Sequence, residues 1–314
     1  MRNPIVAIHG GLGNQLFQWF FAHSLGANQG FLIDPLYDHS VLGDRSFELL
    51  EIIPKCIHMK NSTTNMIILN ILTRFFRVVD RAWNRKLFRP VAEKLGYFRE
   101  DPRNNQAQSH SRPKNVTYAK GYFQKQNVVN ETFPAIEREI IPFLRSGLDL
   151  MRDKYSLGDN YSVIHVRRGD YGDSQTTSDM IGVLSDEYFL NWKLTANSGQ
   201  LVLLTEYVSD VQRLITELNP DLILDKSQTS AWETLAILYG AEFLLGSNSS
   251  LSWWGARLCY ERGGKVWLPS AWSIWGNIDP GDYHFSGSSI QPVQWRDGQT
   301  NQEVTTARNI EGED

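Results

Sequence analysis

The sequence predicts an α/β protein built from two successive halves, and three observations point to this class. A short apolar strand, a glycine-rich turn and an apolar helix open the chain between residues 5 and 27. The same alternation of strands and helices restarts at residue 161. A polar stretch over residues 156–160 separates the two series, as a linker would. The 314 residues are enough for two domains of roughly 150 residues, each with its own core.

Both halves alternate strands with helices, and periodicity and turn residues set the bounds. The first half is predicted to contain a strand at 5–8, a glycine turn at 10–15, a helix at 16–27, a strand at 30–33, a mixed helical segment at 61–95, an exposed loop at 101–114, a short strand ending at 121–124 and a helix at 134–154. The second half is predicted to contain strands at 161–166, 200–204, 221–224 and 243–245, with helices at 210–218, 230–240 and 247–259. We therefore expect domains at 1–155 and 156–298, followed by a polar tail at 299–314.

Composition excludes several classes of protein. The formal net charge of -4 gives no reason to expect nucleic-acid binding, so any anion site has to be local. Cys56 and Cys259 have neither disulfide-framework nor zinc-ligand spacing and are predicted to be reduced thiols. The chain begins in a strand without a signal-peptide pattern, and no run reaches the roughly 20 apolar residues of a spanning helix. We expect a cytoplasmic protein.

Charged residues follow the strand that opens the second half. The segment His165-Val-Arg-Arg-Gly-Asp places Arg167, Arg168, Gly169 and Asp170 directly after the apolar residues of that strand. An arginine pair at a strand end can bind a phosphate through bidentate, charge-assisted hydrogen bonds. A surface turn with solvated charges is the alternative interpretation of this segment.

Two further turns lie between a strand and a helix, where free backbone N–H groups favour a negative ligand. The turn at 247–250 is Ser-Asn-Ser-Ser, more polar than capping alone requires. The turn at 10–15 is Gly-Gly-Leu-Gly-Asn-Gln, and with Asp34 it partly matches the dinucleotide fingerprint. Leu16 stands where that fingerprint has its third glycine, so an NAD-linked oxidoreductase and a plain tight turn both remain open.

Three blocks together resemble a known family. Gly10-Gly-Leu-Gly-Asn-Gln-Leu-Phe-Gln, His165-Val-Arg-Arg-Gly-Asp-Tyr and Ser247-Asn-Ser-Ser-Leu-Ser-Trp-Trp-Gly-Ala closely resemble the α-1,2-fucosyltransferases of glycosyltransferase family 11, and Gly121-Tyr-Phe-Gln is similar to a further block. The blocks keep the family's order over most of the chain. The resemblance implies a GT-B architecture, with two facing Rossmann-like domains and a central cleft. It also implies inverting transfer of fucose from GDP-fucose to the 2-hydroxyl of a galactose, without a metal or other cofactor.

The resemblance assigns roles to residues of this sequence. Arg167 and Arg168 match the arginine pair, one of which would stabilise the β-phosphate of the leaving GDP. The remaining donor-side residues implied are Gly11, Gly13, Asn14, His165, Asn248, Ser249 and Ser250. Of these, Asn14 is expected close to the sugar, and His165 is as well explained as a core residue. Asp170 is either the base that accepts the acceptor's proton or a carboxylate that orients the arginines.

One block departs from the family pattern. Family members commonly carry Ser-Asp-Asp after the strand that follows the arginine motif, whereas this chain has Thr205-Glu206-Tyr207. Glu206 could supply the acid that meets the nucleotide. The change leaves a different GDP-linked deoxysugar, such as a 3,6-dideoxyhexose, open as the donor. The chain also has no Asp-x-Asp motif that would favour a metal site.

A basic segment lies within this acidic chain. Residues 74–94 interleave arginines and lysines with aromatic and aliphatic residues. This pattern suits either contact with anionic lipid headgroups or a helix that packs one face on the core and solvates its arginines. With a lipid-linked glycan as acceptor, the first interpretation would place the enzyme peripherally at the inner face of the membrane.

The leading hypothesis is a cytoplasmic fucosyltransferase of surface polysaccharide or O-antigen biosynthesis, acting on a galactose-terminated glycan that is either free or lipid-linked. Its partners would be a GDP-sugar and that glycan. Besides the oxidoreductase, a non-catalytic module that binds a nucleotide or sugar is the remaining alternative.

Overall fold

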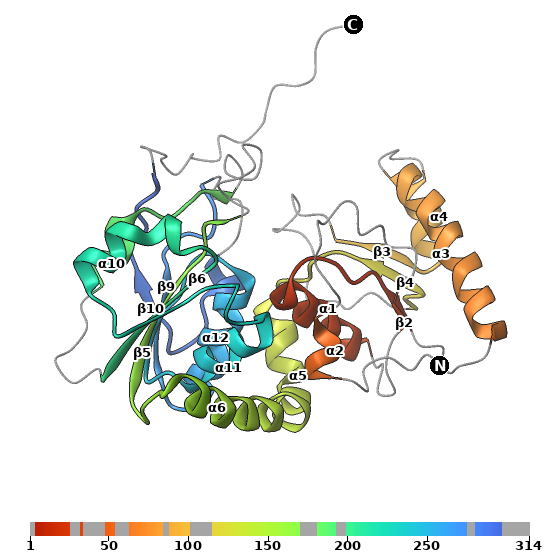
Figure 1. The fold of residues 1–314 in the computed structure, drawn as a ribbon. Helices are drawn as coiled ribbons and strands as arrows, with labels where there is room; N and C mark the ends of the chain where they lie inside the picture. Colours follow the sequence, from red (N-terminus) through yellow and green to blue (C-terminus); the bar gives the residue numbers. More distant parts are fainter. Residues whose placement is uncertain are drawn as a thin grey trace, which may run out of the picture. The chain divides into compact units, whose positions relative to one another are not determined.

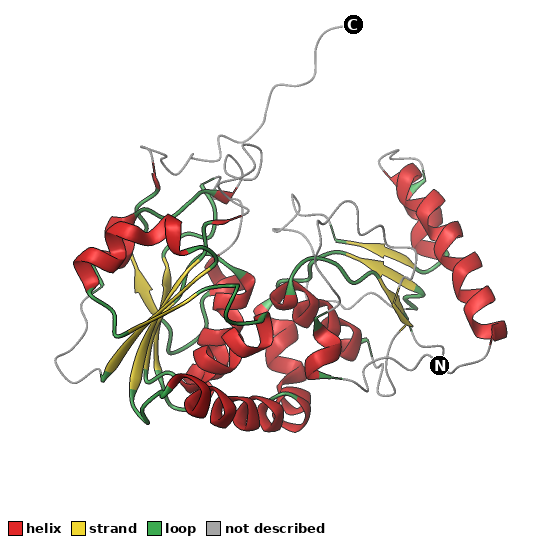
Figure 2. Cartoon of the chain, in the orientation of Figure 1, coloured by secondary structure: helices red, strands yellow, loops and turns green. Residues whose placement is uncertain are grey.

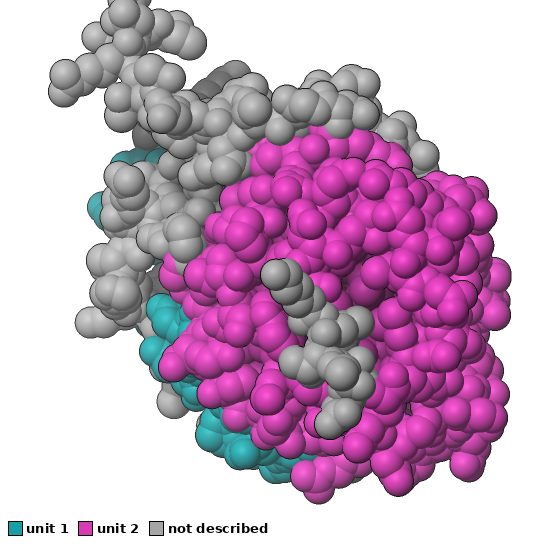
Figure 3. All heavy atoms as spheres, turned by 90° about the vertical axis from the view of Figure 1, so that its left-hand side faces the viewer, with its two compact units in different colours: residues 1–143 teal, residues 144–314 magenta. Residues whose placement is uncertain are grey.

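The computed structural model describes residues 4–25, 32–33, 48–53, 63–83, 88–100, 115–169, 181–192, 199–274 and 280–296. The chain divides into two compact units, residues 1–143 and 144–314, which Figure 3 colours separately. Each unit is an α/β structure around one parallel sheet (Figure 1). None of the helices in the described ranges has the length and apolar character needed to cross a membrane.

The sheet of the first unit has the order β2-β1-β4-β3, with every described pairing parallel. Its strands are β1 (Ile5–Val6), β2 (Leu32–Ile33), β3 (Tyr97–Arg99) and β4 (Tyr118–Lys120), and its helices are α1 (Leu12–Ser24), α2 (Leu49–Ile52), α3 (Thr63–Trp83), α4 (Arg89–Lys94) and α5 (Gln126–Glu139). Because neighbouring parallel strands end at the same edge, the turn after β1 and the segment after β4 lie side by side.

Helix α3 is fastened to this sheet by an apolar face and by one carboxylate. Phe76 and Trp83 are buried against Tyr97 of β3, in a cluster that also includes residues of β1 and β4. Asp80, on the same helix, accepts hydrogen bonds from the Tyr97 hydroxyl at 2.5 Å and from Lys120 at 2.7 Å, and it pairs with Arg99 at 3.1 Å. Three groups on β3 and β4 therefore hold the C-terminal part of α3 in place.

The sheet of the second unit has the order β10-β9-β8-β5-β6-β7, again parallel at each described pairing (Figure 2). Its strands are β5 (Tyr161–Val166), β6 (Gln200–Thr205), β7 (Leu222–Leu224), β8 (Phe243–Leu245), β9 (Lys265–Pro269) and β10 (Ser289–Gln291). The chain builds outward from β5 through β6 and β7, then returns to the other side of β5 with β8. This is the strand order of a doubly wound dinucleotide-binding fold, and its topological switch point lies between β5 and β8.

Helices cover both faces of the second sheet. These helices are α6 (Ile141–Tyr155), α9 (Asp186–Leu190), α10 (Gln212–Leu218), α11 (Ala231–Gly240), α12 (Ser250–Glu261) and α13 (Pro280–Tyr283), with a 3-10 turn, η2, at Val208–Val211. Ile164 and Val166 of β5 pack with residues of α9 and α10 in one core cluster. Tyr161 and His165, on the opposite face of the same strand, bond to α11 and α12. Strand β5 is therefore buried on both faces, as expected of a central parallel strand.

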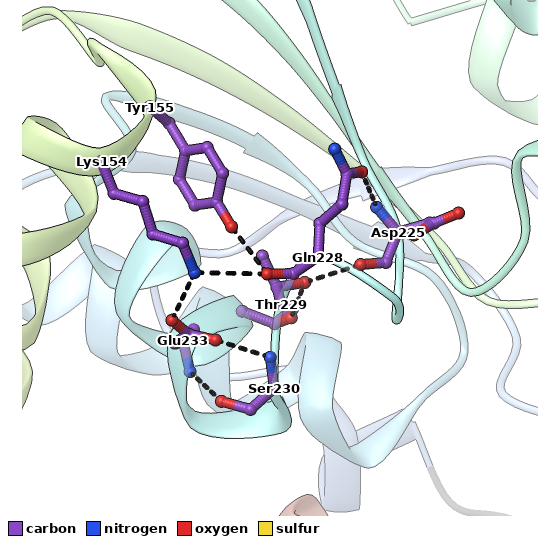
Figure 4. Close-up of polar contacts among 8 residues, drawn as sticks. Lys154, Tyr155, Asp225, Gln228, Thr229, Ser230 and Glu233 are labelled. Atoms are coloured by element: carbon purple, nitrogen blue, oxygen red, sulfur yellow. Dashed lines mark hydrogen bonds and ion pairs between the residues drawn. The ribbon is translucent and has the colours of Figure 1, made fainter.

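The division between the units falls within the segment predicted as the last helix of the first domain. Most of α6 belongs with the second unit, whereas the sequence-based boundary lies at residues 155 and 156. At the end of α6, Tyr155 donates a 2.7 Å hydrogen bond to the carbonyl of Gln228, and Lys154 pairs with Glu233 at 2.9 Å (Figure 4). Glu233 also forms a capping box with Ser230 at the start of α11. These side-chain contacts anchor α6 to α11, and no local sequence pattern signals them.

The predicted α/β class with parallel sheets is confirmed, and the bounds of two predicted helices change. The segment predicted as one helix at 134–154 forms two, α5 and α6, and α5 begins at Gln126 with Pro134 inside it. Helix α1 begins at Leu12 rather than at residue 16, so Gly13 and Asn14 lie in its first turn and Gly11 is its N-cap. The facing arrangement and the cleft of the GT-B architecture stay a prediction. The predicted tail at 299–314 and the loop at 101–114 lie outside the described residues.

We predict that Asp80→Asn lowers the free energy of unfolding by about 1 to 3 kcal/mol at neutral pH, because it removes the carboxylate that pairs with both Lys120 and Arg99. Burial of the Asp80 carboxyl opposes ionisation, but the hydrogen bonds from Lys120 and Tyr97 outweigh it and lower the pKa below the usual value of 3.8. A lowered pKa in the folded state stabilises the protein above pH 3.8, and this contribution disappears as the pH falls through the folded-state pKa. Urea denaturation at several pH values should therefore show the difference between the two proteins shrinking only below pH 3.8. A constant difference would contradict this account.

Candidate functional site

Two polar segments lie at one edge of the second sheet, on either side of its switch point. Strand β5 pairs in parallel with β8, with Ile164 opposite Leu245. Arg167 and Arg168 follow the end of β5, and the turn at 247–250 follows the end of β8. Ligands of doubly wound sheets bind outside the carboxyl ends of the strands at this point. The topology therefore brings together two of the segments that the sequence singled out.

A chain of buried hydrogen bonds links the end of β5 to this turn. The His165 Nδ1 atom lies 2.7 Å from the Ser252 hydroxyl, which lies 3.0 Å from the Ser247 hydroxyl and accepts from the Ser247 N–H at 3.2 Å. Burial and the nearby charge of Arg167 lower the pKa of His165 to about 3, so the ring is neutral near pH 7. His165 lies beneath the turn and contacts it through Ser252.

The turn at 247–250 leads into the start of α12, whose backbone N–H groups could bind an anion. Ser249 is the N-cap, but its hydroxyl makes no capping hydrogen bond, and Ser250 is the first helical residue. The first turn of α12 contains no acidic side chain, and its backbone N–H groups have no acceptors within the helix. Asn248 is fully buried and donates to the carbonyls of Gly182 and Trp272 at 3.1 and 3.3 Å. Asn248 thus anchors the turn, while Ser249 and Ser250 form the helix start.

Arg168 points into the second unit. Its side chain is only 2% exposed and pairs with Asp186 at 2.6 Å. Its guanidinium also donates to the carbonyls of Asp210 and Leu184 at 2.8 and 3.1 Å. Arg168 therefore links the end of β5 to the segments around the starts of α9 and α10. Its guanidinium is bound by groups of the protein itself.

Arg167 lies closer to the surface, beside a carboxylate. Its side chain is 15% exposed and pairs with Glu206 at 2.5 Å, and Glu206 follows the neighbouring strand β6. A Cβ atom at Gly169 would collide with the Glu206 carboxylate, so any other residue there would displace the Glu206 side chain. Of the two arginines, Arg167 has the more exposed side chain, and it follows the strand that pairs with β8.

Asp170 and Asp34 lie outside the described residues. Within the described ranges, no group of three or more His, Cys, Asp or Glu side chains is arranged to hold a metal ion.

The glycine turn of the first unit is occupied by the protein's own side chains. The Leu12 N–H, at the start of α1, donates to the Glu48 carboxylate at 2.7 Å. This negative charge stands where a dinucleotide fold would bind its pyrophosphate, which disfavours that use of the turn. Asn14 accepts a 2.8 Å hydrogen bond from Gln124, which follows β4. The structure therefore joins the glycine turn to the predicted Gly121-Tyr-Phe-Gln block.

Several residues of these two sites were not anticipated from the sequence. Ser252 and Asp186 contact the predicted site residues His165 and Arg168, and Glu48 contacts Leu12 in the predicted glycine turn; each lies 18 or more residues away from its partner. Ser252 is the partial exception, because it lies within the quoted block and one helical turn after Ser249. Asp186 and Glu48 carry no spacing signal, since their roles depend on the tertiary fold.

We predict that Arg168→Ala lowers the free energy of unfolding of the second unit by about 3 kcal/mol, because it leaves the half-buried Asp186 without its cation. The matched control is Arg213→Ala, which removes an equally charged but half-exposed side chain that pairs with Glu187 and Glu217. Exposed pairs contribute about 0 to 1 kcal/mol, so this variant should unfold almost like the wild type. Equal stability of the two variants in urea denaturation would show that Arg168 is not an internal support.

Comparisons with known proteins bear on the family. The family model described as "Glycosyl transferase family 11" matches residues 5–271, and no curated protein matches the chain. Among solved structures, the fucosyltransferase NodZ from Bradyrhizobium is similar at 13% identity over 81% of this chain and 93% of its own, with a TM-score of 0.39. POFUT1 in complex with GDP is similar at 12% identity over 85% and 98%, with a TM-score of 0.39.

The E. coli heptosyltransferase WaaC with ADP is similar at 11% identity over 92% of both chains, with a TM-score of 0.43. Similarities this remote carry no inference about substrate. The family match covers most of the chain and contains the glycine turn, the arginine segment and the serine turn. The chain is a glycosyltransferase and belongs to glycosyl transferase family 11.

Proposed function

We propose that this protein transfers fucose from GDP-fucose to the 2-hydroxyl of a galactose residue, with inversion and without a metal ion. The family membership and the fucosyltransferase-like sequence blocks support the donor and the linkage. The observation that carries the proposal is the placement of Arg167 and the start of α12 at the switch point of the second sheet. This is where a doubly wound unit binds a nucleotide.

The proposed reaction is a displacement at C1 of the fucose. The acceptor oxygen forms a bond to C1 while the bond from C1 to the β-phosphate oxygen of GDP breaks, and the acceptor loses its hydroxyl proton. Negative charge then grows on the β-phosphate. The Arg167 guanidinium and the Ser250 N–H at the start of α12 are suited to stabilise this charge, so a divalent ion is not required.

The base in this scheme is Asp170. Asp170 directly follows Gly169 in the arginine segment, and a carboxylate there could accept the proton of the acceptor hydroxyl. The other role considered for Asp170 is to orient Arg167 and Arg168. Glu206 and Asp186 already pair with Arg167 and Arg168, which favours the role of Asp170 as base.

Unit 1 is proposed to contribute mainly acceptor contacts, with Asn14 close to the transferred sugar. Gly11 and Gly13 shape the turn that presents Asn14, and Gln124 fixes its side chain. The acceptor is proposed to be a galactose-terminated glycan, lipid-linked in the assembly of a surface polysaccharide such as O-antigen, with the enzyme acting in the cytoplasm.

Another GDP-linked deoxysugar is the alternative donor. Glu206 stands where the family commonly has an acidic pair, and in this structure it pairs with Arg167. A 3,6-dideoxyhexose differs from fucose at one hydroxyl, which contacts with the phosphates would not distinguish. The oxidoreductase alternative loses its support, because Glu48 occupies the start of α1 and the chain belongs to a glycosyltransferase family.

We expect Arg167→Ala to lower kcat by about 100- to 1000-fold, the usual loss when one group that stabilises transition-state charge is removed. Arg167→Lys keeps a positive charge but loses the bidentate geometry, so its loss should be smaller. GDP release from GDP-fucose in the presence of a galactoside measures both. Arg213→Ala is the surface control and should keep the wild-type rate. A wild-type rate in Arg167→Ala would remove this arginine from the proposed site.

A transfer screen tests the donor and the linkage together. GDP-fucose and a GDP-linked 3,6-dideoxyhexose would each be offered with galactose-terminated oligosaccharides, and the product linkage read by NMR. We expect transfer of fucose to O2 with an α configuration at the new bond. Transfer to another hydroxyl, retention of configuration or preference for the other donor would each overturn the corresponding part of the proposal.

A further inference from the structure

The outer surface of α3 and α4 exposes apolar side chains in helical register. On α3, Ile71, Phe75 and Val78 recur at i, i+4 and i+7, and their exposed fractions are 61%, 46% and 63%. At α4, Phe88, Val91 and Leu95 recur at i, i+3 and i+7, with exposed fractions of 48%, 54% and 47%. Helices α3 and α4 contact each other, and the six exposed apolar side chains on α3, on α4 and at the ends of α4 are here called the α3–α4 surface. Single exposed apolar residues are ordinary, but such a group marks an interaction surface.

The side chains of the α3–α4 surface are not part of the hydrophobic core of the first unit. The opposite side of α3 carries the buried Phe76 and Trp83, and Asp80 is held by the sheet as described above. The helix is therefore fixed with its apolar stripe directed outward. At the C-terminal end of α3, the guanidinium of Arg89 lies 5.0 Å from the centre of the buried Trp83 ring, which holds the start of α4 against α3.

The charges beside the stripe are mainly positive. Arg74, Arg81 and Lys94 are all exposed on the same two helices, and Glu93 is the exposed acid among their described residues. On a helical wheel, Arg74 and Arg81 lie next to Ile71 and Val78, on the side away from the buried face. The protein as a whole carries a net charge of -4, so this local excess runs against the average. An apolar stripe bordered by cations is the pattern of helices that lie in the interface of an anionic membrane.

We propose that the α3–α4 surface docks this protein peripherally on membranes that contain anionic lipids. The apolar side chains would enter the boundary between headgroups and acyl chains, and the arginines and Lys94 would contact the phosphates. A second copy of the chain is the other conceivable occupant. The row of cations disfavours it, because a two-fold related copy would bring its own arginines against them. The proposal does not depend on the identity of the transferred sugar.

Co-sedimentation with vesicles tests this proposal on the full-length protein. The vesicles would be pure phosphatidylcholine or phosphatidylcholine with about 30% phosphatidylglycerol as the anionic lipid. One variant carries Ile71→Ser, Phe75→Ser and Val78→Ser, and a second carries Arg74→Gln, Arg81→Gln and Lys94→Gln. The control carries Leu150→Ser and Ile290→Ser, two similarly exposed apolar side chains in the second unit.

We expect the wild type and the control to bind the anionic vesicles and to bind neutral vesicles far more weakly. Each basic residue near the surface contributes about fivefold, so the glutamine variant should lose roughly 100-fold in partitioning. The serine variant should lose at least about tenfold on the same vesicles. Negligible wild-type binding, or a serine variant that binds like the control, would overturn the proposal. So would a concentration-dependent dimer that the serine variant abolishes without any change in vesicle binding.

Transfer to a water-soluble galactoside provides an independent readout in the same variants. All substituted residues are exposed and distant in sequence from the site residues, so each variant should keep wild-type GDP release without lipid. Failure of the proposed sugar transfer would appear in this assay in the wild type as well, whereas failure of membrane docking would appear only in sedimentation.

Discussion

The parallel pairing of β5 with β8 is the constraint on which the candidate site depends. These strands are 77 or more residues apart in the chain, yet their pairing fixes where the arginine segment and the start of α12 meet. His165 and Ser252 reinforce the pairing from beneath, through a hydrogen bond of 2.7 Å inside the unit. A neutral imidazole suits this place, because a charged ring would be costly to bury beside Arg167.

Two adjacent arginines have different surroundings in this arrangement. Successive residues at the end of a strand point in opposite directions, so one of the pair enters the core while the other faces the edge of the sheet. The Arg168 guanidinium pairs with Asp186 and donates hydrogen bonds to two backbone carbonyls. Arg167 meets Glu206, a partner that a phosphate could replace or share. This difference assigns support of the site to one arginine and anion binding to the other.

Much of this arrangement could be predicted from the sequence. The apolar strand before Arg167, the capping box at Ser230 and the polar turn at 247–250 are local patterns, and the structure contains the corresponding elements. The start of α1 was misplaced, because Gly11 and Gly13 are typical of a turn, whereas the first helical turn already contains Gly13. Contacts such as Arg168 with Asp186, or Lys154 with Glu233, could not be predicted, since they depend on which elements the fold brings together.

The central claim is that Arg167, rather than Arg168, binds the β-phosphate of the nucleotide. Calorimetric titration of GDP and GMP into the wild type and Arg167→Gln measures the coupling between this side chain and that phosphate. The account predicts that the wild type prefers GDP over GMP by at least about tenfold, and that Arg167→Gln loses most of this preference while its affinity for GMP changes little. An undiminished preference for GDP in Arg167→Gln would contradict the account.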